Sequence, residues 1–470
     1  MRGDLLRRMD WLGPARARGY LRLLAVLNLA ALVALVATAR GGVDRNGFLL
    51  GSDFLSFWTV GRMLHAGAEV YDTAAHIAAQ RTHFAAETGY TAFFYPPSFL
   101  PFCWPLGLAH YIPALAGWLV ATAAVYIVAA RAWRANAGVG APLWLLFVAF
   151  PAVPIVVTHG QTSFLVAGLL GLGAWLVPSR RWIAGVLLGL ATIKPQFGVL
   201  VPLVLLLTRE WRTAAAAFAT AVALASFAAL AFGAHVWTDW LATSGQAEAA
   251  MAAGAMGFGK MISPFAALKL MGAPTGVAYA GQGVVSAVVA GTLAGAAWGR
   301  RWSPALAAPM LCGALLATPF ALDYDAVLLG MPMLWLAGRG LETGFRDWEK
   351  LALLLAFAAP AFARPLALHA GLPVMPLIVG LLFAVLWRRA RSEPMSAADQ
   401  DPAVGGSPLS SRLRHVRRSA QTAARSAVRP VTTAVSALSS VGVPATASPI
   451  RWRRVSRTST GSLWTVGSSS

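Results

Sequence analysis

Residues 21–39, "LRLLAVLNLAALVALVATA", are the first of several segments that decide the fold of this chain. Coiled into a helix, such a run reaches about 28 Å and nearly spans the ~30 Å hydrocarbon core of a bilayer. Residues 213–232, "TAAAAFATAVALASFAALAF", form a second such run. Of the 470 residues, 57% are hydrophobic and only 12% are charged, half the roughly 25% typical of soluble domains. The chain is therefore predicted to be an all-α multi-pass membrane protein.

Short arginine clusters separate the apolar runs, and cytoplasmic loops usually carry such clusters. An even number of crossings must separate neighbouring clusters, which gives about 10–12 transmembrane helices and places both termini in the cytoplasm. The spans are expected near residues 21–39, 112–130, 142–158, 162–177, 182–193, 197–208, 213–232, 277–298, 304–320, 325–338, 351–364 and 372–388. Residues 182–208 are short for two full spans, and either two short helices or a broken re-entrant pair is expected there.

The segments between paired spans are then expected on the outer face: residues 40–111, 233–276 and four short turns at 158–163, 193–196, 320–326 and 364–373. Residues 53–67 have apolar side chains at roughly helical spacing, which predicts an amphipathic helix on the membrane surface. The prolines within 95–105 forbid a regular helix, and "FFYPPSFLPFCWPL" (93–106) is interpreted as a lipid-contacting rim. Most ionisable residues outside the arginine clusters fall in these outer segments, including the four turns.

The rest of the composition narrows the function classes. Net charge is +20, but eleven Arg against three acidic residues beyond Ala390 place +8 of it in a Ser-, Ala- and Thr-rich tail, residues 391–470. This tail is predicted to be disordered and cytoplasmic, and no nucleic-acid partner is expected. Cys103 and Cys312 lie in apolar stretches of the sequence and are predicted to be buried thiols. No ligand spacing for a metal appears, and no metal or cofactor is expected.

Several short motifs occur in one order along residues 20–390. They are "GSDF" (51–54) followed by "VYD" (70–72), then "FFYPPSFLPFCWPL", "HGQTSFLVAGLL" (159–170) and "AGVLLGLATIKPQFGVLVPLVLLLTREWR" (184–212). Their order and spacing resemble glycosyltransferase family 87, bacterial enzymes that are mostly polyprenyl-phosphate-mannose-dependent α-mannosyltransferases with the GT-C membrane fold. The resemblance implies a GT-C-type domain over residues 1–390, in the bacterial cytoplasmic membrane. It also implies sugar transfer to a hydroxyl of an envelope glycolipid or glycan at the outer face.

This reaction needs a base for the acceptor hydroxyl and polar or cationic groups for the leaving phosphate. Asp53 is expected to be the base, and the alternative is a helix N-cap. Lys194 in "TIKPQF" is expected to contact phosphate with help from Gln196, unless Lys194 merely snorkels to the surface. Arg62 and Lys260 are further phosphate candidates, with snorkelling again the alternative for Arg62.

Polar residues in two turns complete the expected site. His159 and Gln161 flank Gly160 and could hydrogen-bond the donor, or they could form a plain connecting turn. Tyr95 is expected to stack on sugar or to anchor the interface. Where the family would have a histidine, this chain has "ATPFALDYDAVLL" (317–329), so the histidine's role is open to Asp323, Tyr324 or His159.

One alternative function remains at this stage, a lipid or solute transporter, because broken helices and isolated intramembrane charges also mark transporters. Polar groups gathered at the outer face favour sugar transfer, whereas charges facing each other at mid-depth would favour transport. The partners expected for the enzyme are the polyprenyl-phosphate-linked sugar, the acceptor and the surrounding membrane lipids.

Overall fold

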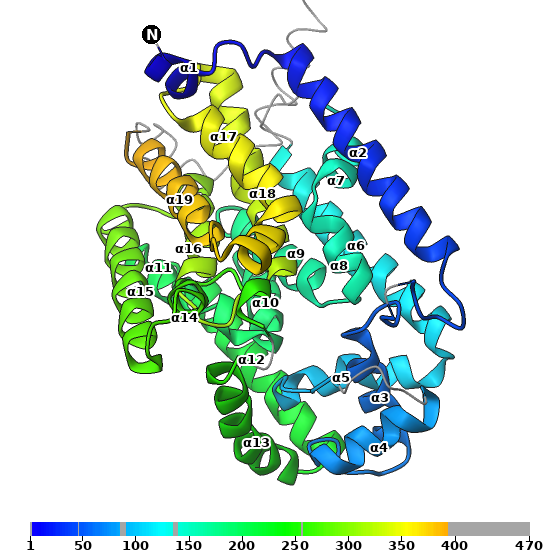
Figure 1. Ribbon diagram of the computed structural model, residues 1–470. Helices are drawn as coiled ribbons and strands as arrows, with labels where there is room; N and C mark the ends of the chain where they lie inside the picture. Colours follow the sequence, from blue (N-terminus) through cyan, green and yellow to red (C-terminus); the bar gives the residue numbers. More distant parts are fainter. Residues whose placement is uncertain (1, 46, 85–90, 135–139, 255–256, 393–470) are drawn as a thin grey trace, which may run out of the picture. The chain divides into compact units, whose positions relative to one another are not determined.

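The computed structural model describes residues 2–45, 47–84, 91–134, 140–254 and 257–392. These residues form 19 α-helices and no β-strand (Figure 1). Five helices are long and apolar enough to cross a membrane: α2 (Pro14–Ala37), α6 (Tyr111–Arg134), α12 (Trp211–Phe232), α15 (Thr275–Ala297) and α18 (Glu349–Ala370). The predicted all-α multi-pass membrane protein is thereby confirmed. The tail from residue 393 onward lies outside the described residues.

Shorter helices account for the remaining apolar segments. They are α7 (Leu143–Ala149), α8 (Ala152–His159), α9 (Ser163–Leu176), α10 (Arg181–Leu190), α11 (Leu200–Leu207), α16 (Pro304–Leu316), α17 (Gly330–Thr343) and α19 (Met375–Ser392). In the bundle, α6 packs against α9, α10 against α12, and α16 against α19. Every expected span therefore contains a helix.

In three segments the structure differs from the expected spans and turns or chooses between the alternatives that the sequence left open. The expected span 142–158 is two helices, because Pro151 has no N–H and disfavours the helical conformation of the residue before it. Residues 182–208 are two short helices, α10 and α11, separated by single 3₁₀ turns at Ala191–Ile193 (η3) and Pro195–Phe197 (η4). The expected outer turn at 364–373 is mostly helix, since α18 continues through Pro365 to Ala370.

The segment after α2 folds into its own packed layer. It contains α3 (Phe54–His65), α4 (Thr73–His83), η1 (Pro97–Phe99), α5 (Leu100–Cys103) and η2 (Trp104–Leu108). The short turns confirm that the prolines prevent a regular helix. Phe57 of α3 lies 5.1 Å, centroid to centroid, from both Tyr95 and Phe99. Nine of the twelve residues of α3 are buried, because η2, α4, α5 and α6 pack against this helix and Phe99 of η1 contacts Phe57. The helix and most of the aromatic stretch thus form a protein core instead of a membrane-surface layer.

The other long connection, residues 233–276, meets this layer. It contains α13 (His235–Ala252), η5 (Phe258–Lys260) and α14 (Pro264–Leu270). Trp240 Nε1 of α13 donates to the Phe94 carbonyl at 3.2 Å. After η5, Ile262 N donates to the Ala321 carbonyl at 2.9 Å, beside the 3₁₀ helix η6 (Asp323–Leu329). Both long connections therefore lie on the same side of the bundle.

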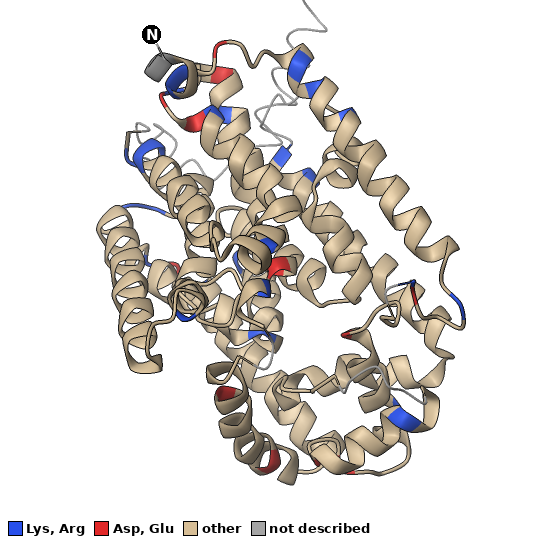
Figure 2. Cartoon of the chain, in the orientation of Figure 1, with Lys and Arg blue, Asp and Glu red and all other residues tan. Residues whose placement is uncertain are grey.

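The arginine clusters lie at the other ends of several helices. Helix α9 begins at Ser163, which contacts Asp325 of η6, and ends shortly before Arg180. Its 14 residues put about 20 Å between the two ends. Figure 2 shows Lys and Arg gathered around α1 (Arg2–Arg8), the start of α2 and the end of α19. The fold separates a polar end near η6 from a basic end.

Candidate active site

A close approach of two chain segments places Asp53 next to the α8–α9 turn. Gly51 N donates to the Thr158 carbonyl at 2.9 Å, and Asp53 N donates to the His159 carbonyl at 3.0 Å. Gly160 ends α8 in the left-handed conformation, with φ of +65°. A Cβ there would lie 2.5 Å from the Cβ of Phe54. Glycine is therefore required twice over, for the turn itself and for the contact that holds Asp53.

The Asp53 carboxylate stands at the N-cap position of α3 but makes no capping hydrogen bond. Gln161 Nε2 donates to Asp53 Oδ2 at 2.9 Å, and Ser52 Oγ donates to Oδ1 at 3.3 Å. Asp53 itself is half-buried. Asp72 provides the contrast in the same layer, because its carboxylate accepts from Ala75 N at 2.8 Å and caps α4. The carboxylate of Asp53 thus points to the Gln161 amide instead of serving its own helix.

Gln161 connects Asp53 to two tyrosines. Its amide donates to the Tyr324 hydroxyl at 3.2 Å, and its carbonyl accepts from the Tyr95 hydroxyl at 2.8 Å. The Tyr95 hydroxyl also lies 2.9 Å from Thr162 Oγ1. Gln161 is buried, so these hydrogen bonds fix the direction in which its amide presents its N–H groups. The site therefore consists of a half-buried carboxylate backed by a fixed polar network.

Lys194 belongs to a second, fully buried group behind Tyr324. Its Nζ lies 2.6 Å from Asp325 Oδ1, with side-chain exposures of 7% and 3%. Ser163 Oγ also donates to Asp325 Oδ1, at 2.7 Å, and Leu322 N donates to Oδ2 at 3.1 Å. The ammonium lies 5.0 Å from the centre of the Tyr324 ring. Lys194 therefore does not snorkel to the surface; its charge is neutralised inside the protein and packs against Tyr324.

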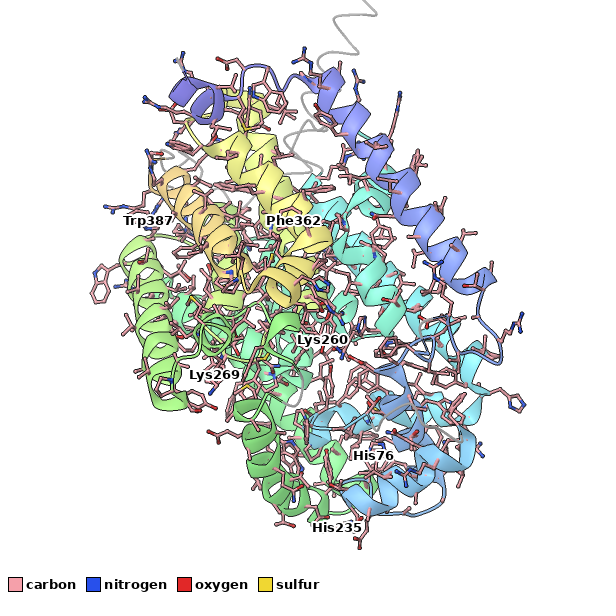
Figure 3. All side chains as sticks on the ribbon, viewed as in Figure 1. His76, His235, Lys260, Lys269, Phe362 and Trp387 are labelled. Carbon is pink, nitrogen blue, oxygen red and sulfur yellow. The ribbon has the colours of Figure 1, made fainter. Side chains whose placement is uncertain are left out.

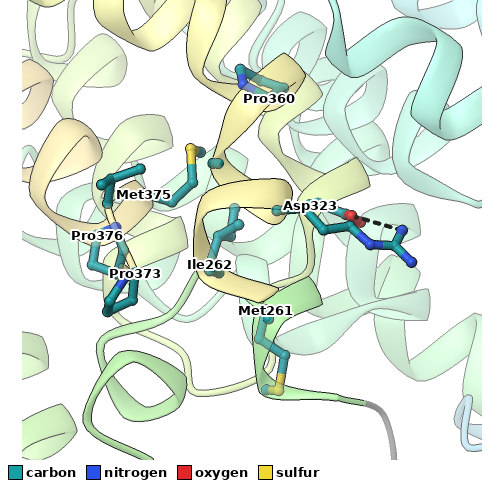
Figure 4. A pocket seen from close by; sticks show the side chains of 12 residues that line it. Met261, Ile262, Asp323, Pro360, Pro373, Met375 and Pro376 are labelled. Carbon is teal, nitrogen blue, oxygen red and sulfur yellow. Dashed lines mark hydrogen bonds and ion pairs between the residues drawn. The ribbon is translucent and has the colours of Figure 1, made fainter. Parts of the chain in front are cut away.

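Arg364 is the cation that the sequence analysis missed. Its Nη1 lies 3.4 Å from Asp323 Oδ2, and Asp323 Oδ1 accepts from Tyr324 N at 2.9 Å. Figure 4 shows this pair at the edge of a pocket between η5, η6 and the end of α18. The pocket has a volume of about 10 Å³, room for one water molecule and not for a sugar. The Arg364 side chain is 32% exposed, so it is only partly covered by the protein.

His159 and Lys260 lie near the residues of η6, His159 beside Tyr324 and Lys260 close to Asp323. His159 has its ring 5.7 Å from that of Tyr324, and its Nδ1 lies 2.8 Å from the Ile155 carbonyl. Lys260 is half-buried, and its ammonium has no hydrogen bond or ion pair with any residue that the structure describes (Figure 3). The next residue, Met261, pairs with Leu322, immediately before Asp323. Lys260 therefore lies in a segment of the chain that runs next to Asp323.

Two candidates, Arg62 and Gln196, make no hydrogen bond or ion pair with the other candidate residues within the described part of the chain. Arg62 is exposed nine residues along α3 from Asp53, a rise of about 14 Å. Its Nη1 donates to the Gly107 carbonyl at 3.3 Å, and its guanidinium lies 5.8 Å from the centre of the Trp58 ring. Gln196 is half-buried, and its side chain makes no hydrogen bond within the described part of the chain. A phosphate role for either residue remains a prediction without support from the geometry.

The two aspartates of "DYD" diverge as their spacing predicts. Asp323 turns to Arg364, and Asp325 turns to Lys194. Within residues 2–45, 47–84, 91–134, 140–254 and 257–392, no three His, Cys, Asp or Glu side chains gather closely enough to hold a metal ion. Cys103 and Cys312 are both buried free thiols, as the sequence indicated. The polar chemistry of this site rests on carboxylates, hydroxyls, amides and cations.

Some of these groups had a signal in the sequence and others did not. Arg364 lies outside the arginine clusters and in an expected outer turn, which is the property that singled out Lys194. The hydroxyls of Ser52, Thr162 and Ser163 had no such signal, because serine and threonine are common throughout the chain. Their functions become visible only when the helix ends that carry them meet.

Comparisons with known proteins agree with this geometry. No curated protein and no solved structure matched the chain. The model of glycosyltransferase family 87 matches residues 93–319, a range that contains Tyr95, Gln161, Lys194 and Lys260. The match confirms the family resemblance seen in the motifs and favours a transferase over the transporter alternative. The match, which covers just under half of the chain, supports membership of glycosyltransferase family 87 and with it a membrane glycosyltransferase in general.

Proposed function

We propose that the protein transfers a sugar from a polyprenyl-phosphate-linked donor to a hydroxyl group of an envelope glycolipid or glycan. The acceptor oxygen forms a bond to the anomeric carbon, and the bond from that carbon to the phosphate oxygen breaks. The acceptor proton moves to a carboxylate, and the polyprenyl phosphate leaves with the bonding electrons. Mannose is the sugar that the family resemblance suggests first.

The observation that carries this proposal is the position of the Asp53 carboxylate and its hydrogen-bond partners. Its carboxylate occupies a helix N-cap position without capping, is half-exposed, and accepts hydrogen bonds from the neutral donors of Gln161 and Ser52. A carboxylate fixed in this way can accept a proton from a hydroxyl placed within hydrogen-bonding distance. Such a proton transfer typically contributes about 10²–10⁴-fold to the rate.

The leaving phosphate requires positive charge or N–H donors near the sugar. Arg364 supports this role because it is partly exposed and pairs with Asp323 at 3.4 Å, longer than an optimal charge-assisted hydrogen bond. Lys260, whose ammonium has no partner among the described residues, is the second candidate. Lys194 is tied to Asp325 and is assigned instead to holding the ring of Tyr324 in place. We therefore move the phosphate contact from Lys194 to Arg364 and Lys260.

We place the reaction at the outer face of the bacterial cytoplasmic membrane, with both termini inside. The polar centre lies at the ends of α8, α9 and η6, whereas Arg180, Arg300 and Arg388 lie at other ends of the helices. Because arginine-rich loops stay in the cytoplasm, this separation supports an outward-facing site. A polyprenyl donor with its head group at that face would meet Asp53 and Arg364 together.

The test compares two isosteric substitutions in the full chain, purified into nanodiscs and supplied with polyprenyl-phosphate-mannose and an envelope glycolipid extract. Asp53→Asn removes the base, and we expect a loss of transfer of about 10²–10⁴-fold. Asp72→Asn is the matched control, because Asn and Asp cap helices equally well. We expect it to leave transfer unchanged.

Two results would contradict parts of the proposal. Equal activity of wild type and Asp53→Asn would show that Asp53 is not the base and would direct attention to Asp323. Wild-type protein that transfers nothing from polyprenyl-phosphate-mannose, but does transfer another polyprenyl-phosphate sugar, would change the sugar and keep the mechanism. Failure with every polyprenyl-phosphate sugar would refute the donor class.

A further inference from the structure

A large pocket lies at the basic end of the bundle, apart from the site around Asp53. It has a volume of about 1000 Å³, at the upper end of the range for ligand pockets. Its walls come from the first turns of α2 and from α6, α7, α17 and α18. They are mostly apolar and include Leu21, Leu24, Phe147, Leu334 and Phe357. We call this cavity the α2 pocket.

Helix α2 leaves the pocket open because it packs loosely. Ala25 is its only buried residue within the described chain. The helix is fixed farther along, where Asn28 Nδ2 donates to the Val148 and Ala149 carbonyls at 2.9 and 3.1 Å. Figure 1 shows α2 beside α7, and the N-terminal turns of α2 extend beyond the end of α7. Leu21 and Leu24 of α2 and the facing apolar side chains of α7 and α18 leave an apolar surface inside the pocket, which an apolar occupant would cover.

The pocket's lining is cationic at one end. Four basic residues, Arg8, Arg18, Arg346 and Lys350, line it together with Asp10 and Asp347. Asp347 is paired with Arg7 at 2.6 Å, and Asp10 lies 3.9 Å from Lys350. The arginines Arg8 and Arg18 are exposed and have no hydrogen bond or ion pair with any described side chain or backbone group. Two guanidinium groups are thus left for a ligand.

We propose that the α2 pocket binds an anionic phospholipid. Its phosphate lies against Arg8 and Arg18, and its acyl chains lie among the leucines and phenylalanines of α2, α7, α17 and α18. The charge complementarity favours an anionic head group, because arginine forms paired hydrogen bonds with phosphate oxygens. Basic pockets between helices at an arginine-rich membrane face bind anionic lipids in this way. The proposal does not depend on the donor sugar or on Asp53.

The chain's own tail is the main competing occupant, and its charge argues against it. From Arg391 onward the tail carries eleven arginines against Glu393, Asp399 and Asp401, a net charge of +8. Seating this segment at Arg8 and Arg18 would bring like charges together. An anionic lipid has the opposite charge and an apolar part that matches the walls.

The experiment uses the full chain in a neutral detergent and native mass spectrometry. Phosphatidylglycerol and phosphatidylcholine with the same acyl chains are added in turn, and retained lipid is counted. We expect wild type to retain phosphatidylglycerol preferentially. Arg8→Gln with Arg18→Gln should weaken that preference about 25-fold, since each arginine contributes about fivefold. Arg40→Gln with Arg45→Gln removes the same charge beyond the other end of α2 and should have no effect.

A second measurement tests the apolar part. A photoreactive phenylalanine analogue in place of Leu334, inside the pocket, should crosslink to added phosphatidylglycerol. A crosslink to residues 393–470, or to a second copy of the chain, would overturn the proposal. It would also be overturned by equal retention of the two lipids, or by a preference that survives loss of Arg8 and Arg18.

Discussion

The buried pair of Lys194 and Asp325 allows the sharpest test of how the site is held together. Replacing Lys194 by Met leaves Asp325 with a side-chain exposure of 3% and no cation. Breaking a buried ion pair from one side typically costs 3–5 kcal/mol. Asp325 keeps the donors Ser163 Oγ and Leu322 N, so we expect the lower end of this range, about 3 kcal/mol. The free energy of unfolding would be measured by reversible unfolding in mixed micelles.

The double substitution separates the ion pair from its surroundings. Lys194→Met with Asp325→Asn removes both charges, and the single carbonyl oxygen of Asn can replace only one carboxylate oxygen. One hydrogen bond is then lost, at a cost of about 1 kcal/mol. The double variant should therefore be about 2 kcal/mol more stable than Lys194→Met alone. Lys269→Met is the control, because Lys269 donates to Thr275 Oγ1 and has no acidic partner among the residues that the structure describes. It should cost less than about 1 kcal/mol.

Two outcomes of the stability measurements would refute this reasoning. Enzyme kinetics would then test whether Lys194 contacts the donor phosphate. A cost below about 1 kcal/mol for Lys194→Met, or a double variant as unstable as the sum of the single changes, would show that the pair does not hold the site. If the double variant is stable but its KM for the polyprenyl-phosphate donor rises, Lys194 contacts phosphate as the sequence suggested. An unchanged KM supports the assignment of phosphate to Arg364 and Lys260.

Other expected results follow from single contacts. Arg364→Gln should lower kcat/KM for the donor about 10–100-fold through loss of a charge-assisted hydrogen bond, whereas Arg81→Gln, at an exposed arginine of α4, should not. Gly160→Ala should destabilise the protein more than Gly371→Ala, since both have φ near +65° but only Gly160 has a neighbour at 2.5 Å; thermal unfolding compares them. Burial lowers the pKa of His76 to about 4, below its value of about 6.5 when unfolded. The unfolded chain therefore takes up this proton first, and the stabilisation present above pH 6.5 should fall by about 2 kcal/mol on acidification to pH 4.5. His76→Gln should flatten this slope in a pH series of unfolding measurements.

The spans were predictable because length and apolar composition are local properties of the chain. Each expected span contains a helix, and the break at Lys194 and Pro195 follows from the proline itself. The same reasoning applied to Pro151 would have found the break between α7 and α8. The burial of α3 was not predictable, because apolar spacing does not distinguish a helix covered by lipid from one covered by protein. Here Phe93 and Phe99, far along the chain, cover it.

Individual site residues were predictable, but their pairing was not. Asp53, Gln161, Lys194 and Asp323 stood out as polar residues at expected outer turns. The partners are separated by 108 residues for Asp53 and Gln161 and by 131 for Lys194 and Asp325. Such contacts depend on the order in which helices pack, which no local pattern records. Nothing in the sequence indicated that Asp325 lies 2.6 Å from the Lys194 ammonium, and the phosphate contact expected of Lys194 stays a prediction.

The pairing also distinguishes Asp53 from the two other aspartates near Tyr324. Three carboxylates lie within electrostatic reach of Tyr324: Asp53, Asp323 and Asp325. Asp323 faces Arg364, and Asp325 faces Lys194. An acceptor hydroxyl that approached either of these two carboxylates would meet a group already bound to a cation. Within the described residues, Asp53 is held by the neutral groups of Gln161 and Ser52 and forms no ion pair. Of the three carboxylates, Asp53 is thus the one that no described cation holds, and our proposal of Asp53 as the base rests on this arrangement.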